Sequence, residues 1–85
     1  MNSEEFIDKC KDMVVEFYNT VVDYGDYSLD TGSINVVFLS CVGSDYKTVL
    51  TTFEDNLFYE VTYYRRDDAF VFDVYHKCSH QVYKV

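Results

Sequence analysis

Three residues near the carboxyl end carry groups of the kind that zinc prefers as ligands. His76, Cys78 and His80 occupy alternate positions, so an extended strand would place all three on one side. Residues two apart on a strand are about 7 Å apart along the chain, which is too far for one tetrahedral ion. No Cys-x-x-Cys pair accompanies them. We therefore expect no metal site and no bound cofactor.

A cysteine nucleophile is the second chemistry that the sequence offers. Cys41 ends a predicted strand beside Gly43 and Ser44, and histidines lie elsewhere in the chain, as a thiol activated by a base requires. On an apolar strand face, however, a cysteine more often packs as a small hydrophobe. The chain also has no glycine-rich phosphate loop and no HExxH or GxSxG motif. We expect no catalytic residues and no enzyme activity.

A row of carboxylates on a predicted N-terminal helix carries the most functional information. At 100° per residue these side chains fill an arc of about 80° opposite the apolar arc. Carboxylates four residues apart lie about 6 Å apart along a helix axis, comparable with successive phosphates of a nucleic acid. A cationic groove could accept such a helix in place of nucleic acid, although a charged row is also the ordinary solvated face of an amphipathic helix. The predicted partner-binding residues are Glu5, Asp8, Asp12, Glu16 and Asp23.

Net charge restricts the kind of partner. Fifteen acidic and seven basic side chains give a net charge of -8, which opposes direct binding to nucleic acid or to an anionic membrane. The chain has nine tyrosines, which could stack on bases, but Glu60 and Asp73 place carboxylates beside them and would repel phosphate. We expect a basic protein partner, no direct nucleic-acid contact and no membrane contact. Whether the chain forms a homodimer stays an open question.

Length and composition predict one folded domain over residues 1–85. A chain of 85 residues has room for a single core, and 48% hydrophobic residues without any proline exclude a disordered linker. Three cysteines at unrelated spacings do not make a disulfide framework, which favours a reducing cytoplasm. The longest apolar run, Val36–Leu39, falls far short of the roughly 20 residues of a membrane span, and we expect no signal peptide.

Hydrophobic periodicity predicts a helix over residues 3–24. Apolar residues recur at spacings of three and four, Asn2 or Ser3 can cap the first turn, and Glu5 lies three residues after Asn2 as in a capping box. Gly25 marks the end.

From Ile34 onward the pattern alternates, as it does in β-strands. It predicts strands at 34–41, 46–53, 57–64 and 69–76, with an optional edge strand at 81–85. Both faces of the first strand are apolar, which predicts a central position in the sheet. Short connections favour antiparallel neighbours, so the predicted fold is α+β, one N-terminal amphipathic helix packed on a four- or five-stranded antiparallel meander sheet. The predicted core comprises Phe6, Val14, Phe17, Val21, Val36, Phe38 and Val61.

The Tyr-Glu-Val-Thr-Tyr run at 59–63 and several further segments of the chain resemble a family of small phage and prophage proteins of unknown function. The likeness spans nearly the whole chain, and its most specific part is the Tyr-Glu-Val-Thr-Tyr run at 59–63. Phe38 stands where a tryptophan is expected in the first strand. The resemblance implies an origin in a phage accessory region and transfers no catalytic residues. The matching segments are Glu5–Lys11, Val15–Asn19, Thr51–Thr52, Phe58–Tyr63 and Phe72–Tyr75.

Small size, acidity and the phage-like segments together predict a phage-encoded inhibitor of a host defence or nucleic-acid-binding protein, by analogy with anti-CRISPR proteins. Its partner would be a basic protein of the host bacterial cytoplasm, such as a CRISPR effector or another nucleic-acid-handling enzyme. Two alternatives stay open. One is a small-ligand protein that sequesters a nucleotide signal, which needs Arg65, Arg66 or Lys47 exposed beside tyrosines. The other is a structural accessory protein.

Overall fold

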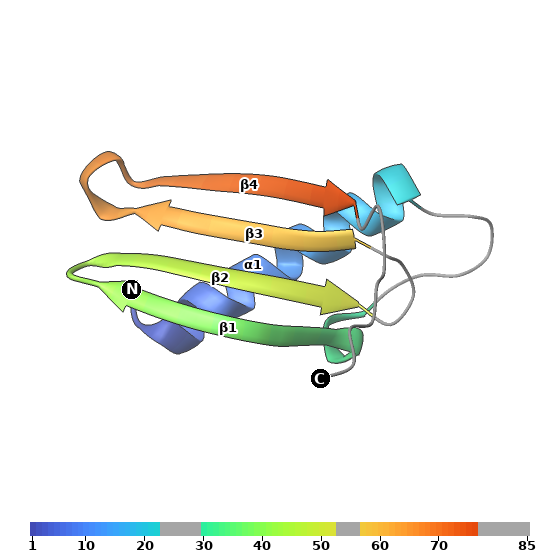
Figure 1. Ribbon diagram of the computed structural model, residues 1–85, viewed down its shortest axis with the longest axis horizontal. Coiled ribbons are helices and arrows are strands. Elements are labelled where there is room, and N and C mark those ends of the chain that lie inside the picture. The colour runs from blue at the N-terminus through green and yellow to red at the C-terminus, as the bar shows by residue number, and fades with distance from the viewer. Residues whose placement is uncertain (23–29, 53–56, 77–85) are drawn as a thin grey trace, which may run out of the picture.

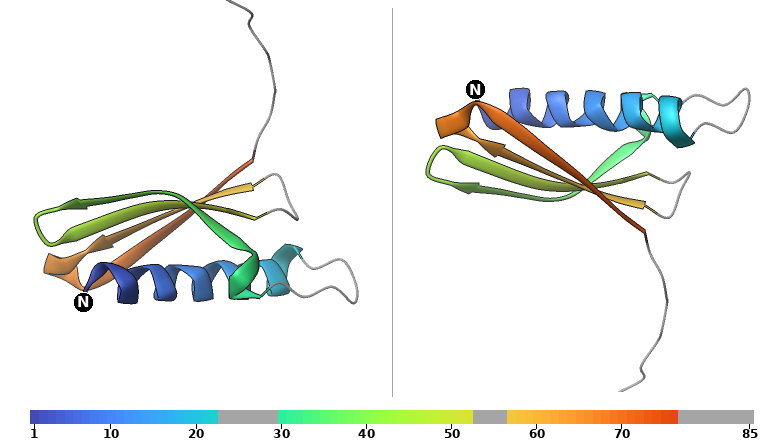
Figure 2. Two further views of the ribbon diagram at one scale, coloured as in Figure 1. Left: turned by 90° about the horizontal axis from the view of Figure 1, so that it is seen from below. Right: turned by 90° about the horizontal axis from the view of Figure 1, so that it is seen from above.

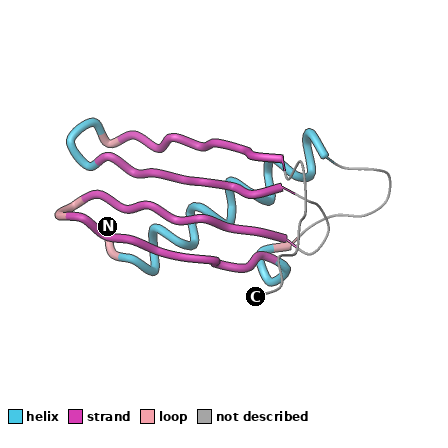
Figure 3. The backbone as a smooth tube through the Cα atoms, viewed as in Figure 1, coloured by secondary structure: helices cyan, strands magenta, loops and turns pink. Residues whose placement is uncertain are grey.

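One helix lies across one face of a four-stranded antiparallel sheet, and no other described element covers the opposite face, which is called the uncovered face below (Figures 1 and 2). This computed structural model describes residues 1–22, 30–52 and 57–76. The strands follow one another in the sheet in the order β1-β2-β3-β4, so the predicted α+β meander is confirmed (Figure 3). The elements are α1 (Ser3–Phe17), η1 (Tyr18–Val22), η2 (Thr31–Ser33), β1 (Ile34–Val42), β2 (Asp45–Thr52), β3 (Leu57–Tyr64), η3 (Arg65–Asp67) and β4 (Ala69–His76).

The start of α1 is fixed by the predicted cap. The Oδ1 atom of Asn2 accepts a hydrogen bond from the backbone N–H of Glu5 at 2.8 Å, which satisfies one of the donors that the first helical turn leaves free. The α-helix ends at Phe17 and continues as a π-helical turn to Val22, somewhat short of the predicted 3–24. Asp23 and Gly25 lie outside the described residues.

Two hairpins join the strands at one end of the sheet. Gly43 has a φ of 62° and Ser44 does not have a positive φ, as a two-residue type II′ turn between β1 and β2 requires. Between β3 and β4, Asp68 adopts a left-handed φ of 46°, a conformation that aspartate tolerates better than most residues. The strands β3 and β4 span the predicted residues, β1 ends one residue later than predicted, and β2 begins one residue earlier. The predicted last residue of β2, Phe53, lies outside the described residues. The optional strand at 81–85 lies outside the described residues.

The predicted central position of β1 is wrong, because β1 is an edge strand that pairs only with β2. Its register shifts between Val36, which pairs with Leu50, and Phe38, which pairs with Val49. Val37 is thus the extra residue of a β-bulge. Since Leu50 is buried beneath α1 and successive residues of a strand alternate between faces, Phe38 points to the uncovered face.

The core lies between α1 and the inner faces of β2, β3 and β4. Residues four apart on α1 point into it, with Tyr18 rather than the predicted Phe17 as the last fully enclosed ring. Phe17 is half-buried at the margin, with its ring against those of Tyr59 and Phe72. Val36 and Phe38, predicted in the core, are exposed, because β1 is an edge strand and its bulge turns Phe38 away from α1. The buried residues are Phe6, Cys10, Val14, Tyr18, Ile34, Leu50, Tyr59, Val61 and Tyr63.

Candidate partner-binding surfaces

The acidic face of α1 comprises Glu5, Asp8, Asp12 and Glu16. All four carboxylates are exposed, because the apolar face of the helix packs on the sheet and turns the opposite side outward (Figure 2). None of them forms an ion pair with another residue in the described ranges. The fifth predicted residue, Asp23, lies outside the described residues.

Two lysines reduce the negative charge of α1. Lys9 is exposed and, being four residues after Glu5 and three before Asp12, lies on the same side of the helix. Lys11 is half-buried. With Glu4 included, α1 holds five acidic and two basic residues, so its net charge is -3. Neither lysine forms an ion pair with a described residue, and the acidic face keeps its negative character.

A groove borders the acidic face near the end of α1. Its volume is about 320 Å³, and it lies between the helix and β4. The lining is mainly apolar, from Met13, Phe17 and Phe72, with Thr20 and the carboxylate-bearing Glu16 at the side. A partner could therefore place an apolar group against the rings and a cation against Glu16 in the same contact.

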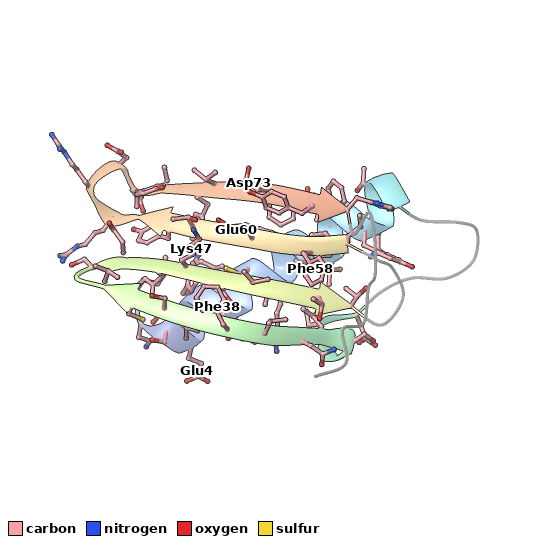
Figure 4. All side chains as sticks on the ribbon, viewed as in Figure 1. Glu4, Phe38, Lys47, Phe58, Glu60 and Asp73 are labelled. Carbon is pink, nitrogen blue, oxygen red and sulfur yellow. The ribbon has the colours of Figure 1, made fainter. Side chains whose placement is uncertain are left out.

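The uncovered face of the sheet carries charged side chains at its centre. Lys47 on β2 reaches Glu60 on β3, with 2.9 Å between its Nζ and Oε1, and this carboxylate raises the pKa of Lys47. Asp73 on β4 stands directly opposite Glu60, so two carboxylates face each other across the strand pair (Figure 4). Lys47 offsets the negative charge of Glu60. Asp73 forms no ion pair with another described residue.

Apolar side chains surround these charges and extend along β1. Phe38 is 44% exposed on this face, and Val36, Val37 and Leu39 are exposed at the β1 edge beside it, Val37 most of them at 57%. Antiparallel sheets with one solvated face ordinarily place polar residues there. The alternating pattern of β3 and β4 places Phe58, Tyr64 and Tyr75 on the second face of the sheet, but it does not show that no described element covers this face. The other large apolar side chains exposed on the sheet are Val42, Phe58, Tyr64, Val71 and Tyr75.

A polar pocket of about 310 Å³ lies where the two hairpins meet. The guanidinium of Arg65 donates a hydrogen bond to the Oγ of Ser44 at 2.8 Å, and the hydroxyl of Tyr46 donates to the carbonyl of Met1 at 3.1 Å. The hydroxyl of Tyr63 donates to Asp68 at 2.7 Å, which raises the pKa of Tyr63. Met1, Gly43, Ser44, Tyr46, Tyr63 and Arg65 line the pocket.

The thiols and imidazoles singled out from the sequence do not converge within the described residues. Cys41 is exposed, with its Sγ atom 3.8 Å from the Oγ of Ser3. It lies at the hairpin end of the sheet, whereas His76 pairs with Leu57 at the far end, so these two cannot form a nucleophile and base. Cys78 and His80 lie outside the described residues, and no cluster of three metal-ligating side chains occurs within them. Burial raises the pKa of the Cys10 thiol to about 12.

Comparison with known proteins gives a family but no function. A family of unknown function, DUF6275, matches residues 7–85. The chain belongs to this family. No curated protein and no solved structure matches it. Over the described residues of this DUF6275 protein, no helix combines the length and apolar character that a membrane crossing needs.

Proposed function

We propose that this DUF6275 protein is a non-catalytic inhibitor that binds a basic, nucleic-acid-handling protein through the acidic face of α1. The observation that carries the proposal is the set of exposed carboxylates at Glu5, Asp8, Asp12 and Glu16, without ion-pair partners among the described residues. Like charges four residues apart destabilise a helix by a few tenths of a kcal/mol. The helix nevertheless carries Asp8, Asp12 and Glu16 four residues apart, which favours a role of these carboxylates in binding.

The groove beside Glu16 supports the proposal that the partner binds at the acidic face. Exposed charges steer association and give specificity, but they add little affinity by themselves. Binding energy concentrates where an apolar group is fully desolvated, and the rings of Phe17 and Phe72 offer such a place next to the acidic face. A basic partner with an apolar side chain beside a lysine or arginine fits both features.

A more specific form of the proposal is a phage-encoded inhibitor of a host defence protein, such as a CRISPR effector, that acts in the bacterial cytoplasm. This form rests on the sequence resemblance to small phage and prophage proteins. In it the chain competes with nucleic acid for a cationic groove, and no reaction, cofactor or metal is involved.

The proposal is tested by comparing three baits in pull-downs from a bacterial lysate with mass spectrometry. The wild-type chain is compared with Asp12→Lys/Glu16→Lys on α1 and with the control Asp67→Lys/Asp73→Lys, which changes the net charge equally outside α1. We expect a protein that the wild type and the control capture, that the α1 variant loses, and that nucleic acid displaces. The association rate of this protein should fall as salt rises. Equal capture by the α1 variant, or a salt-independent rate, would refute the acidic-face mechanism.

A second candidate function is sequestration of a small anionic ligand such as a nucleotide. The pocket at the hairpins favours it, because Arg65 lies there beside Tyr46 and Tyr63, the combination that this alternative required. The neighbouring Asp45 accepts a hydrogen bond from the backbone N–H of Arg65 at 3.0 Å and weakens the local positive charge. Calorimetric titration with a set of mononucleotides and cyclic dinucleotides tests this candidate. Binding lost in Arg65→Ala would favour it, and absence of binding would remove it.

A further inference from the structure

The outer edge of β1 exposes both its backbone and its apolar side chains. β1 pairs with β2 on one side only, so the backbone groups on its other side have no strand partner among the described elements. Val36, Val37, Phe38 and Leu39 are exposed at 40%, 57%, 44% and 38%. Natural edge strands usually carry charged residues or proline that prevent pairing with another chain. β1 has neither, and among the described strands only its bulge at Val37 interrupts this edge.

Charge distinguishes β1 from every other long element of the described chain. β2 holds Asp45 and Lys47, β3 holds Glu60, β4 holds Asp73, and α1 holds five carboxylates, whereas Ile34–Val42 contains no charged residue. Two copies of a chain with a net charge of -8 repel each other at most approaches. Pairing through β1 places no charged residue of one strand opposite a charged residue of the other. At the other edge, β4 would bring the two copies of Asp73 together.

We propose that two copies of the chain associate through antiparallel pairing of β1 with β1 of the second copy, which joins their sheets into one continuous sheet. The pairing is isologous, because antiparallel strands are related by a two-fold axis. It supplies partners for the free backbone edge and covers Val36 and Leu39 on one face and Phe38 on the other. The bulge confines regular hydrogen bonding to the residues on either side of Val37, so the dimer is weak and forms as the concentration rises.

The salt dependence of this dimer is opposite to that of the proposed partner binding. Both copies are strongly acidic, and Glu4 projects past the β1 edge on the α1 side (Figure 4). Added salt screens this repulsion and therefore strengthens the dimer, whereas it weakens binding of a basic partner to the acidic face. Failure of one idea leaves the other standing, because they use different surfaces and have opposite responses to salt.

The experiment is sedimentation velocity of the purified chain over a concentration series from about 1 μM to 1 mM, at low and at physiological salt. Val37→Lys is compared with Val71→Lys. The control makes the same substitution on the other edge strand, at Val71, whose side chain is 42% exposed. We expect the wild type and Val71→Lys to dimerise and Val37→Lys to dissociate at least tenfold more readily. A wild type that stays monomeric at 1 mM overturns the proposal, and so does a dimer that Val71→Lys weakens more than Val37→Lys.

Amide hydrogen exchange of the wild type tests the pairing without any substitution. In a strand-paired dimer the outward amides of β1 on either side of the bulge gain protection as concentration rises, because they become hydrogen-bonded to the second copy. A dimer formed by stacking of the uncovered faces would leave these amides unchanged. Concentration-dependent protection confined to β1 supports the proposal. Protection elsewhere, or none, refutes it even if Val37→Lys fails to fold.

Discussion

Replacement of Phe6 by alanine tests how α1 is attached to the sheet. The Phe6 side chain is 0% exposed. Its ring stacks on that of Tyr46 with 5.1 Å between centroids and lies 6.2 Å from that of Phe70. Through these contacts it joins the first turns of the helix to β2 and β4, so its loss leaves a cavity that the rigid sheet cannot close.

The expected cost is large for a domain of this size. Truncation of a buried phenylalanine to alanine costs about 3–5 kcal/mol, whereas a chain of this length unfolds with a free energy of roughly 4–13 kcal/mol. Each kcal/mol lowers the melting temperature by about 4–8 °C in small domains. Phe6→Ala should therefore melt at least about 12 °C below the wild type.

Urea unfolding followed by circular dichroism measures the change, at a concentration low enough to keep the chain monomeric. Phe38→Ala is the matched control, because Phe38 is 44% exposed on the uncovered face and should cost less than about 1 kcal/mol. Phe17→Ala should lie between them, since its ring is half-buried against Tyr59 and Phe72. If Phe38→Ala costs as much as Phe6→Ala, the bulge and the assignment of Phe38 to the uncovered face are wrong.

Three further predictions concern single groups. Burial raises the pKa of Cys10 from its ordinary value of 9.0 to about 12 in the folded chain, so the unfolded state loses this proton first. The free energy of unfolding should therefore fall between pH 9 and 12 by up to about 1.4 kcal/mol per pH unit. Cys10→Ala should flatten this slope in urea titrations, and an unchanged slope would contradict the burial of Cys10. Tyr63→Phe removes the 2.7 Å hydrogen bond to Asp68 and should cost about 0.5–1.5 kcal/mol in the same assay, against no loss for the exposed Tyr64→Phe. Gly43→Ala places a side chain in open space at a φ of 62°, so it should cost about 1–2 kcal/mol from backbone strain alone, and a stability equal to that of wild type would exclude the left-handed turn.

Local signals in the sequence were sufficient for the elements and the fold class. The cap at Asn2, the turn at Gly43 and the alternating runs of β3 and β4 depend on neighbouring residues, so they can be recognised without tertiary information. The exposed carboxylates of α1 follow from the same helical period. These parts of the prediction required only that each element face one core.

The features that sequence reasoning missed depend on distant contacts. A bulge at Val37, between the apolar Val36 and Phe38, cannot be recognised in a run of apolar residues, so Phe38 was assigned to the wrong face. The edge position of β1 follows from strand order, which an apolar strand does not reveal by its composition. The pocket at the hairpins combines Tyr46, Tyr63 and Arg65 from separate segments, and only the register of the sheet brings them together.

The meander connectivity has a consequence for the order of folding. Each strand pairs with the strand next to it in sequence, so the sheet can grow by successive hairpins, each of which closes a short loop. α1 precedes the strands in the chain, yet a helix of 15 residues is marginal by itself in water. Its buried face packs on β2, β3 and β4. The helix is therefore expected to become stable only after the strands that follow it in the chain have been synthesised and paired.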